Sequence, residues 1–311
     1  MALHRFEPKV YRNTIGTYEP VLTIASGDTV ITTTADARGV DAAGKRVAEG
    51  PNPQTGPFLV TGAQPGDMLS VHFDRLRPNR RHGWSATVIA PNVLDPDYVK
   101  QTPEPGFSQW DIDLEAGTAT LIEAEVAFGH ISLPLEPMLG CFGVAPPMGQ
   151  AISTATSSTH GGNMDYRGFV QGVTVHFPVF VPGALFYLGD GHALQGDGEI
   201  VGTGIEVSFD VQFTVRLVEG KTIQWPRAEN ESYIMTVGNA RPLDQCVQHA
   251  TTEMVRWLEQ DYRLDRRGVH LFLGQGARYE VGNIFDPAYT MVCKMSKKLL
   301  DQIGPPRQTA V

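Results

Sequence analysis

The chain has 311 residues and a mass of 33.9 kDa, which suits one large domain or two fused ones. Hydrophobic residues make up 41% and charged residues 19%, a balance that excludes a disordered or collagen-like chain. The net charge of −9 argues against nucleic acid or an anionic membrane as a partner, because both are themselves negative. We therefore expect a globular protein with neither partner.

The sequence carries no signal that would direct the chain to a membrane. No apolar run approaches the roughly 20 residues of a membrane span, and the first residues lack the apolar stretch of a signal peptide. The three cysteines are widely spaced and fit neither a disulfide framework nor a zinc finger. Cysteines without a disulfide framework are typical of a reducing compartment, so they predict a cytoplasmic location. Cys141 lies among glycine and proline, where we expect a small buried residue rather than a nucleophile.

Strand patterns dominate the first two thirds of the chain. Residues 68–76 alternate apolar and polar after a turn signal, and residues 173–181 share an apolar phase that Pro178 interrupts, which favours a sheet edge or a bulge. The clearest pattern covers residues 205–217, which alternate strictly. It predicts a long half-buried strand whose polar residues, beginning with Glu206, face water.

Helical periodicity is confined to the last quarter of the chain. Apolar residues recur at spacings of three and four just after Pro242, which predicts a helix over 242–260. A second helix is expected over 265–273, ended by Gly274, and the chain then becomes extended over 278–286 and 289–294.

Helices that follow a run of strands indicate a mainly β protein rather than a doubly wound sheet. We expect a β-sandwich or barrel-like body of long antiparallel strands with a C-terminal α+β segment. The body, built from one or two β subdomains and carrying the site, would cover residues 1–235. The C-terminal segment would cover 236–311 and pack on it.

Two segments, 153–168 and 189–199, place ligand-type side chains among glycines. Such glycines let a backbone turn sharply or approach a bound group closely. Asp190 and His192 are two positions apart, so in an extended chain both side chains leave the same face. A carboxylate and an imidazole arranged in this way either bind a divalent metal or act as an acid–base pair.

Ordinary structural roles explain several other candidates better. Asp197 and Gly198 are typical of a tight turn, and a histidine beside glycines is more often a hydrogen-bonded residue than a ligand. The Ser- and Thr-rich run 153–159 lacks the motif of a nucleophile elbow. His72 and His176 occupy polar positions of their strands, which predicts a wet surface for both.

The two glycine-rich segments resemble the acetamidase/formamidase family of amide hydrolases, and the chain length resembles its shorter, acetamidase-type branch. The likeness is carried by His160-Gly161-Gly162-Asn163 followed by Asp165, by Gly189-Asp190 followed by His192, and by Gln195-Gly196-Asp197-Gly198-Glu199. Weaker matches are Gly143-Val144-Ala145-Pro146 and Gly62-Ala63-Gln64-Pro65-Gly66-Asp67. The resemblance covers most of residues 28–260, but the region 77–119 matches only loosely.

This resemblance implies a β-rich, homo-oligomeric hydrolase that converts a small aliphatic amide to a carboxylate and ammonia with a divalent metal, zinc by expectation. It makes His160, Asp165, Asp190 and His192 the candidate metal ligands. Glu199 becomes the candidate general acid–base, and Asn163 and Gln195 the residues that position the amide. Asp36 is a candidate for an additional ligand.

Two alternatives to a linear-amide hydrolase stay open. Because the region 77–119 matches loosely, the same fold would also suit a cyclic amide or another small C–N compound. A β-rich scaffold with a glycine-lined metal site would also suit a non-catalytic protein that binds a small molecule or a metal.

Overall fold

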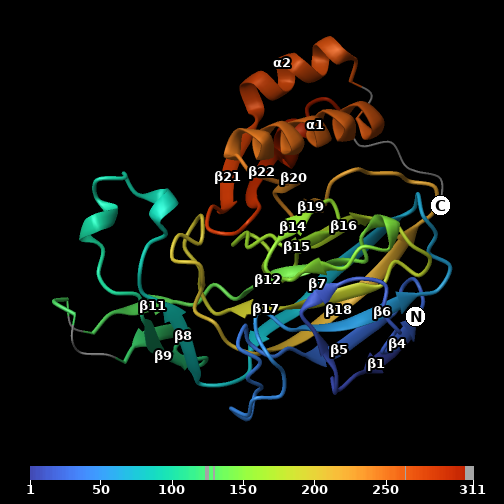
Figure 1. Cartoon of the computed structure of the whole chain (residues 1–311). Helices are drawn as coiled ribbons and strands as arrows, with labels where there is room; N and C mark the ends of the chain where they lie inside the picture. The colour runs from blue at the N-terminus through green and yellow to red at the C-terminus, as the bar shows by residue number, and fades with distance from the viewer. Residues whose placement is uncertain (123–125, 129, 263, 305–311) are drawn as a thin grey trace.

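A computed structural model of the chain describes residues 1–122, 126–128, 130–262 and 264–304. Antiparallel strands make up most of the regular structure in these residues, and the α-helices follow residue 242 (Figure 1). The prediction of a mainly β protein with a C-terminal α+β segment is therefore confirmed. No helix within the described ranges is long and apolar enough to cross a membrane.

The largest sheet has nine strands and runs from the N-terminal part of the chain to the C-terminal part. Its long central strands alternate buried and less buried side chains, as expected of a sheet with one face on a core. In spatial order its strands are β1 (Leu3–Arg5), β5 (Thr29–Thr33), β18 (Phe209–Val218), β7 (Met68–Pro78), β16 (Thr174–Pro178), β19 (Arg227–Glu229), β20 (Tyr233–Ala240), β22 (Tyr289–Ser296) and β21 (Arg278–Asn283).

A second sheet of seven strands packs on the first. All residues of its two central strands, β12 and β17, are buried. In spatial order its strands are β14 (Ser157–Ser158), β15 (Gly161–Asn163), β12 (Met138–Val144), β17 (Phe186–His192), β6 (Gln54–Val60) and β2 (Tyr11–Arg12), with β4 (Leu22–Ile24) also paired to β6. A small pair joins β3 (Thr14–Ile15) to β13 (Ile152–Ser153), and a short 3-10 turn, η3, covers Pro147–Gly149.

Aromatic side chains connect the two large sheets. The ring of Phe73 on β7 lies 5.0 Å from that of Phe142 on β12, and the ring of Phe213 on β18 lies 5.3 Å from that of Phe58 on β6. All four rings are fully buried. Edge-to-face pairs of this kind add to the stability from area burial alone. The two sheets therefore form a sandwich around one hydrophobic core.

The strand predicted over 68–76 is confirmed as part of β7, but the strand predicted over 205–217 begins only at Phe209. Before that point Glu206 forms isolated β-bridges with Trp84 and with His192. These contacts cover the polar side of the segment, so Glu206 is 2% exposed and Ser208 is fully buried. The prediction that these polar residues face water is wrong.

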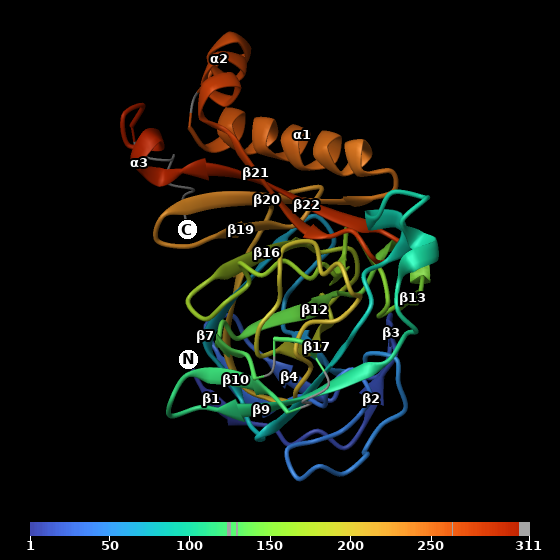
Figure 2. The same cartoon turned by 90° about the vertical axis from the view of Figure 1, so that its left-hand side faces the viewer.

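Helices α1 (Leu243–Asp261) and α2 (Arg266–Gly276) cover one face of β20 and β22 (Figure 2). The first confirms the predicted helix over 242–260. The second continues two residues past Gly274, where the sequence predicted its end. A short helix that the sequence did not predict, α3 (Lys297–Leu300), follows β22.

The structure also tests the predictions for Pro178, His176 and Cys141, and only the last is confirmed. Pro178 ends β16, but this strand lies between β7 and β19, so it is not a sheet edge. His176 is only 7% exposed, because Ser70 and the ring of Trp257 contact it; its predicted wet position is wrong. Cys141 is fully buried, as expected.

A smaller sheet stands beside the sandwich (Figure 1). Its strands are β8 (His82–Ala86), β9 (Phe107–Asp113), β10 (Thr118–Leu121) and β11 (Ser132–Pro134), and the 3-10 turns η1 (Pro91–Val93) and η2 (Val99–Gln101) lie between β8 and β9. Asn92 in η1 donates a hydrogen bond to the carbonyl oxygen of Ile284 at 2.6 Å. The loosely matching region 77–119 is thus tied to the end of β21.

Replacing Phe142 by alanine is expected to destabilise the protein strongly. Phe142 contacts the rings of Phe73, Phe169 and Phe177 in the core, and a buried Phe→Ala change costs about 3–5 kcal/mol. Phe128→Ala is a matched control, because Phe128 is 66% exposed. Denaturant unfolding checks both variants, and similar losses in both would contradict this description of the core.

Candidate functional site

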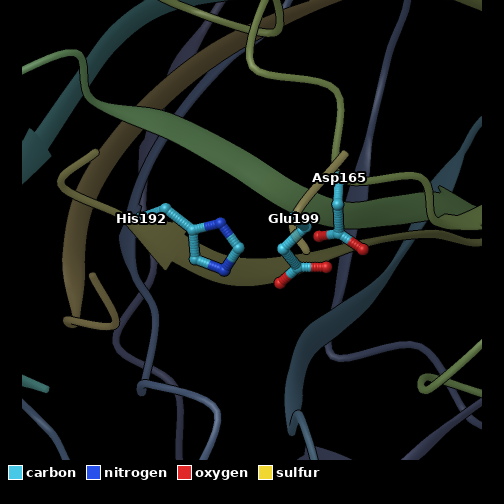
Figure 3. Close-up of side chains that lie close together, drawn as sticks. All are labelled: Asp165, His192 and Glu199. Atoms are coloured by element: carbon cyan, nitrogen blue, oxygen red, sulfur yellow. The ribbon is translucent and has the colours of Figure 1, made fainter. Parts of the chain in front are cut away.

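Five buried carboxylates and one imidazole gather at one end of the seven-stranded sheet. We call the carboxylates, each no more than 8% exposed, the carboxylate cluster; they belong to Asp165, Asp190, Glu199, Glu206 and Asp286. Figure 3 shows the imidazole of His192 and two carboxylates of the cluster, those of Asp165 and Glu199, close together. The two glycine-rich segments identified from the sequence therefore meet in space.

Three of the four predicted metal ligands converge on the space above Gly140 in β12. A Cβ atom added to Gly140 would lie 2.1 Å from Asp165 Oδ1, 2.7 Å from Asp190 Oδ2 and 3.2 Å from His192 Cε1. Only glycine leaves room for these side chains to approach the strand so closely.

The ring of His192 is oriented by Gln195. Gln195 donates from Nε2 to the carbonyl oxygen of Asp165 at 2.5 Å, which fixes its amide so that Oε1 faces His192 Nδ1 at 2.9 Å. Because Oε1 only accepts, Nδ1 must carry a hydrogen. Nε2 then points at the carboxylates, and once this nitrogen has no proton the ring has the orientation of a metal-binding histidine.

Glu206 is a member of this site that sequence reasoning missed. Its Oε1 atom lies 2.8 Å from His192 Nε2, and Asp190 Oδ1 lies 3.3 Å from the same nitrogen. The strict alternation after residue 205 placed Glu206 on a wet face. The glycines at 202 and 204 were the signal of a change in direction, since they interrupt the strand phase just before it.

The described residues contain two groups whose ligand atoms lie within 4.8 Å of one another: Asp165 with His192 and Glu199, and Asp190 with His192 and Glu206. Three buried atoms in these groups, Asp165 Oδ1, His192 Nε2 and Glu206 Oε2, have no hydrogen-bond partner among the described residues. Buried polar atoms are normally paired. Unpartnered polar atoms in two groups that share His192 fit a bound divalent cation.

The electrostatics of the site follow from burying several carboxylates together beside one imidazole. Burial, followed by the charge of Asp190, raises the pKa of Asp165 well above its usual range, and burial with Asp165 does the same to the pKa of Glu199. Burial also raises the pKa of Glu206 to about 7. Burial works against a charged His192, but Glu206 and Asp190 outweigh it and raise the pKa of the imidazole. In the described residues no lysine or arginine pairs with these carboxylates.

The backbone at the site is unusual. Seven described residues other than glycine have a positive φ, and four of them lie here: Asn52 at 48°, Asp165 at 41°, Asp190 at 62° and Glu199 at 47°. A left-handed conformation is uncommon for such residues, and it clusters at functional sites. It turns the three carboxylates inward from the loops and the strand end that carry them.

Side-chain amides surround the carboxylate cluster. Asn163 donates to Asp286 Oδ2 at 2.6 Å and accepts from Asn52 Nδ2 at 2.6 Å. Its two polar atoms therefore already have partners within the protein, as those of Gln195 do. Asn163 and Gln195 were expected to position a substrate amide; their observed contacts hold Asp286 and His192.

Two further candidates lie apart from the two metal-capable groups. His160 is fully buried, neither ring nitrogen has a partner among the described residues, and burial lowers its pKa to about 4. Asp36 pairs with Arg80 and accepts from Trp84 Nε1 and from the backbone N–H groups of Arg38 and Val40. These contacts give Asp36 a structural role, and its part as an additional ligand stays a prediction.

Comparison with known proteins supports the likeness seen in the sequence. A sequence model of the Acetamidase/Formamidase family matches residues 147–252. The acetamidase of Mycolicibacterium smegmatis is 27% identical over 222 residues, which cover 53% of this chain and 53% of that protein. The chain thus spans about half the length of the curated relatives it matches.

Solved structures give a more complete match. A protein described as a predicted acetamidase/formamidase from Thermoanaerobacter tengcongensis superposes with a TM-score of 0.83 at 27% identity, covering 97% of this chain and 98% of that one. The acetamidase from Yersinia enterocolitica gives a TM-score of 0.81 at 29% identity, with 96% and 93% covered. The resemblance to the acetamidase/formamidase family is confirmed over the whole fold.

Replacing Gly140 by alanine is expected to disrupt the site while the sandwich remains folded. The added methyl would collide with Asp165 Oδ1 and Asp190 Oδ2, and Gly140 needs no left-handed backbone conformation. We expect zinc affinity to fall about 10–100-fold, as for other changes that misorient ligands. Gly196→Ala is the matched control, since no atom lies within 4 Å of its added Cβ. Titration with zinc measures both, and equal affinities would contradict the convergence at Gly140.

Proposed function

We propose that this chain, a relative of the acetamidase/formamidase proteins, is a metal-dependent amidohydrolase that hydrolyses the C–N bond of a small linear amide to a carboxylate and ammonia. The convergence of Asp165, Asp190 and His192 on one buried point, where Asp165 Oδ1 and His192 Nε2 have no hydrogen-bond partner among the described residues, carries the proposal. An amide needs help at both ends of this bond, because its carbonyl is a poor electrophile and its nitrogen a poor leaving group.

The ligands that we propose are His192 through Nε2 together with Asp165 and Asp190, and Glu206 joins them as an addition to the predicted set. His160 stays in that set only as a prediction from the resemblance. Mixed imidazole and carboxylate ligands suit zinc, our proposed ion, although manganese and iron accept similar donors. A divalent cation held there lowers the pKa of a coordinated water and polarises a carbonyl oxygen.

Glu199 is the proposed general acid–base. Its carboxylate lies in the same buried group as Asp165 and His192, and burial raises its pKa toward the range in which a carboxyl group can both accept and return a proton. Glu199 would take a proton from the attacking water and deliver it to the departing nitrogen. Asn163 and Gln195 would serve this reaction by holding Asp286 and His192 in place.

A cytoplasmic location and a homo-oligomeric state belong to the same proposal. Both rest on the sequence and on the family resemblance. Fractionation and light scattering would test them without reference to the site.

Removing the metal is expected to abolish hydrolysis. After treatment with a chelator, ammonia release from acetamide and formamide should vanish, and it should return when zinc is added. A panel of linear and cyclic amides separates linear-amide hydrolysis from the cyclic-amide alternative. Thermal stabilisation by the amides without any product would instead support a non-catalytic binding protein.

Single substitutions separate metal binding from proton transfer. Glu199→Gln should lower kcat by about 10²–10⁴-fold, the usual contribution of a general acid–base. His192→Ala should lower both bound zinc and kcat. His72→Ala is the control for His192→Ala, because His72 is a half-buried histidine of β7 that contacts Thr174 on β16 and no residue of the site. Full activity in His192→Ala would refute the ligand assignment, and full activity in Glu199→Gln would refute the acid–base assignment.

A further inference from the structure

Asn283 stands at the end of β21, far from both glycine-rich segments in the sequence. β21 pairs with β22, and the register shifts between Val281 and Asn283. Such an irregularity redirects the side chain that follows it. The same strand end is bonded to the loop that carries Glu199: Gly198 N–H donates to the carbonyl oxygen of Gly282, and Ile284 N–H donates to that of Gly198.

The orientation of the Asn283 amide is fixed by backbone donors. Its Oδ1 atom accepts from the N–H groups of Phe285 at 2.8 Å and Asp286 at 2.9 Å. Asn283 is also fully buried, so water does not compete for these contacts. The Nδ2 group must then face the other way, into the carboxylate cluster.

Three carboxylate oxygens surround Asn283 Nδ2: those of Asp165 at 2.8 Å, Glu199 at 2.9 Å and Asp286 at 2.8 Å. An amide nitrogen has only two hydrogens to donate. Asp286 Oδ2 already receives a hydrogen bond from Asn163 at 2.6 Å. Because Asp286 has this second donor and Asp165 Oδ2 and Glu199 Oε2 have no other side-chain donor among the described residues, we assign the two hydrogens of Asn283 to Asp165 and Glu199, one each.

We infer that Asn283 is a positioning residue that clamps one oxygen of Asp165 and one oxygen of Glu199, and so leaves their other oxygens for the cation and the reacting water. Asp165 shows the expected result, because its second oxygen, Oδ1, is buried and unpartnered among the described residues. The inference rests on the proposed function, since it assigns Asn283 a role toward the same cation.

A neutral donor suits this task better than a cationic one. Two buried carboxylates repel each other, and a hydrogen bond to each reduces the cost of holding them together. Lysine or arginine at this position would neutralise them and compete with a metal ion for the same negative charge. The amide orders both carboxylates and leaves their charge in place.

The test compares Asn283→Ala with Asn239→Ala. Asn239 on β20 is a buried amide at the same end of the sheet, and it bonds Ser158 and Thr290 rather than a carboxylate. Both variants should lower the thermal unfolding temperature of the metal-free protein. Only Asn283→Ala should lower zinc affinity, by about 10–100-fold, in a competition titration with a chromophoric chelator.

Asn283→Ser provides a second variant if alanine prevents folding. Its hydroxyl can donate one hydrogen bond, so we expect a loss of zinc affinity smaller than that in Asn283→Ala and larger than that in Asn239→Ala. If wild-type protein binds zinc and hydrolyses amides while the Asn283 variants keep wild-type affinity, the clamp alone is overturned. If wild-type protein binds no divalent cation, the proposed function and the clamp fall together.

Discussion

The burial of several carboxylates around one histidine is the constraint on which the rest of the site depends. Removing a charge from water costs several kcal/mol unless a partner compensates it. Elsewhere this chain uses the usual remedy, since the buried Glu253 pairs with the buried Arg227 at 2.8 Å. In the carboxylate cluster the described neighbours are amides instead, and amides satisfy hydrogen bonds without cancelling charge. The negative charge is thereby kept available for a cation.

The sandwich makes such a cluster tolerable because it surrounds the site with rigid, buried strands. Gly140 lies within β12 and His192 at the end of β17, two strands without an exposed residue. The loops that bring Asp165 and Glu199 are held in left-handed backbone conformations, which need strong surrounding packing to persist. The close packing therefore holds these residues in their strained conformations, and the ligand atoms are oriented before anything binds.

The sequence was informative where residue type and spacing coincide. Asp190 and His192 could be recognised because glycines isolate them as a pair, and the helix over 242–260 because its apolar period is regular. Glu206 was missed for the opposite reason, since a perfect alternation hides the fact that its polar side is covered by β8 and β17. The structural contacts of Asp36 could not be predicted, because a carboxylate that accepts from a turn backbone looks the same in a sequence as one that binds a metal.

Asn283 shows a different limit of prediction from the sequence, because its role depends on contacts between distant segments. An asparagine after a strand is typical of a turn, and only the pairing of β21 with Gly198 reveals that it reaches the site. The family match ends at residue 252, so it contains the proposed ligands but neither Asn283 nor Asp286. The division predicted at residue 235 stays a prediction, yet the site crosses it. A body of residues 1–235 alone would keep Asp165 and Glu199 and lose the amide between them, so the C-terminal segment does more than cover the sheet.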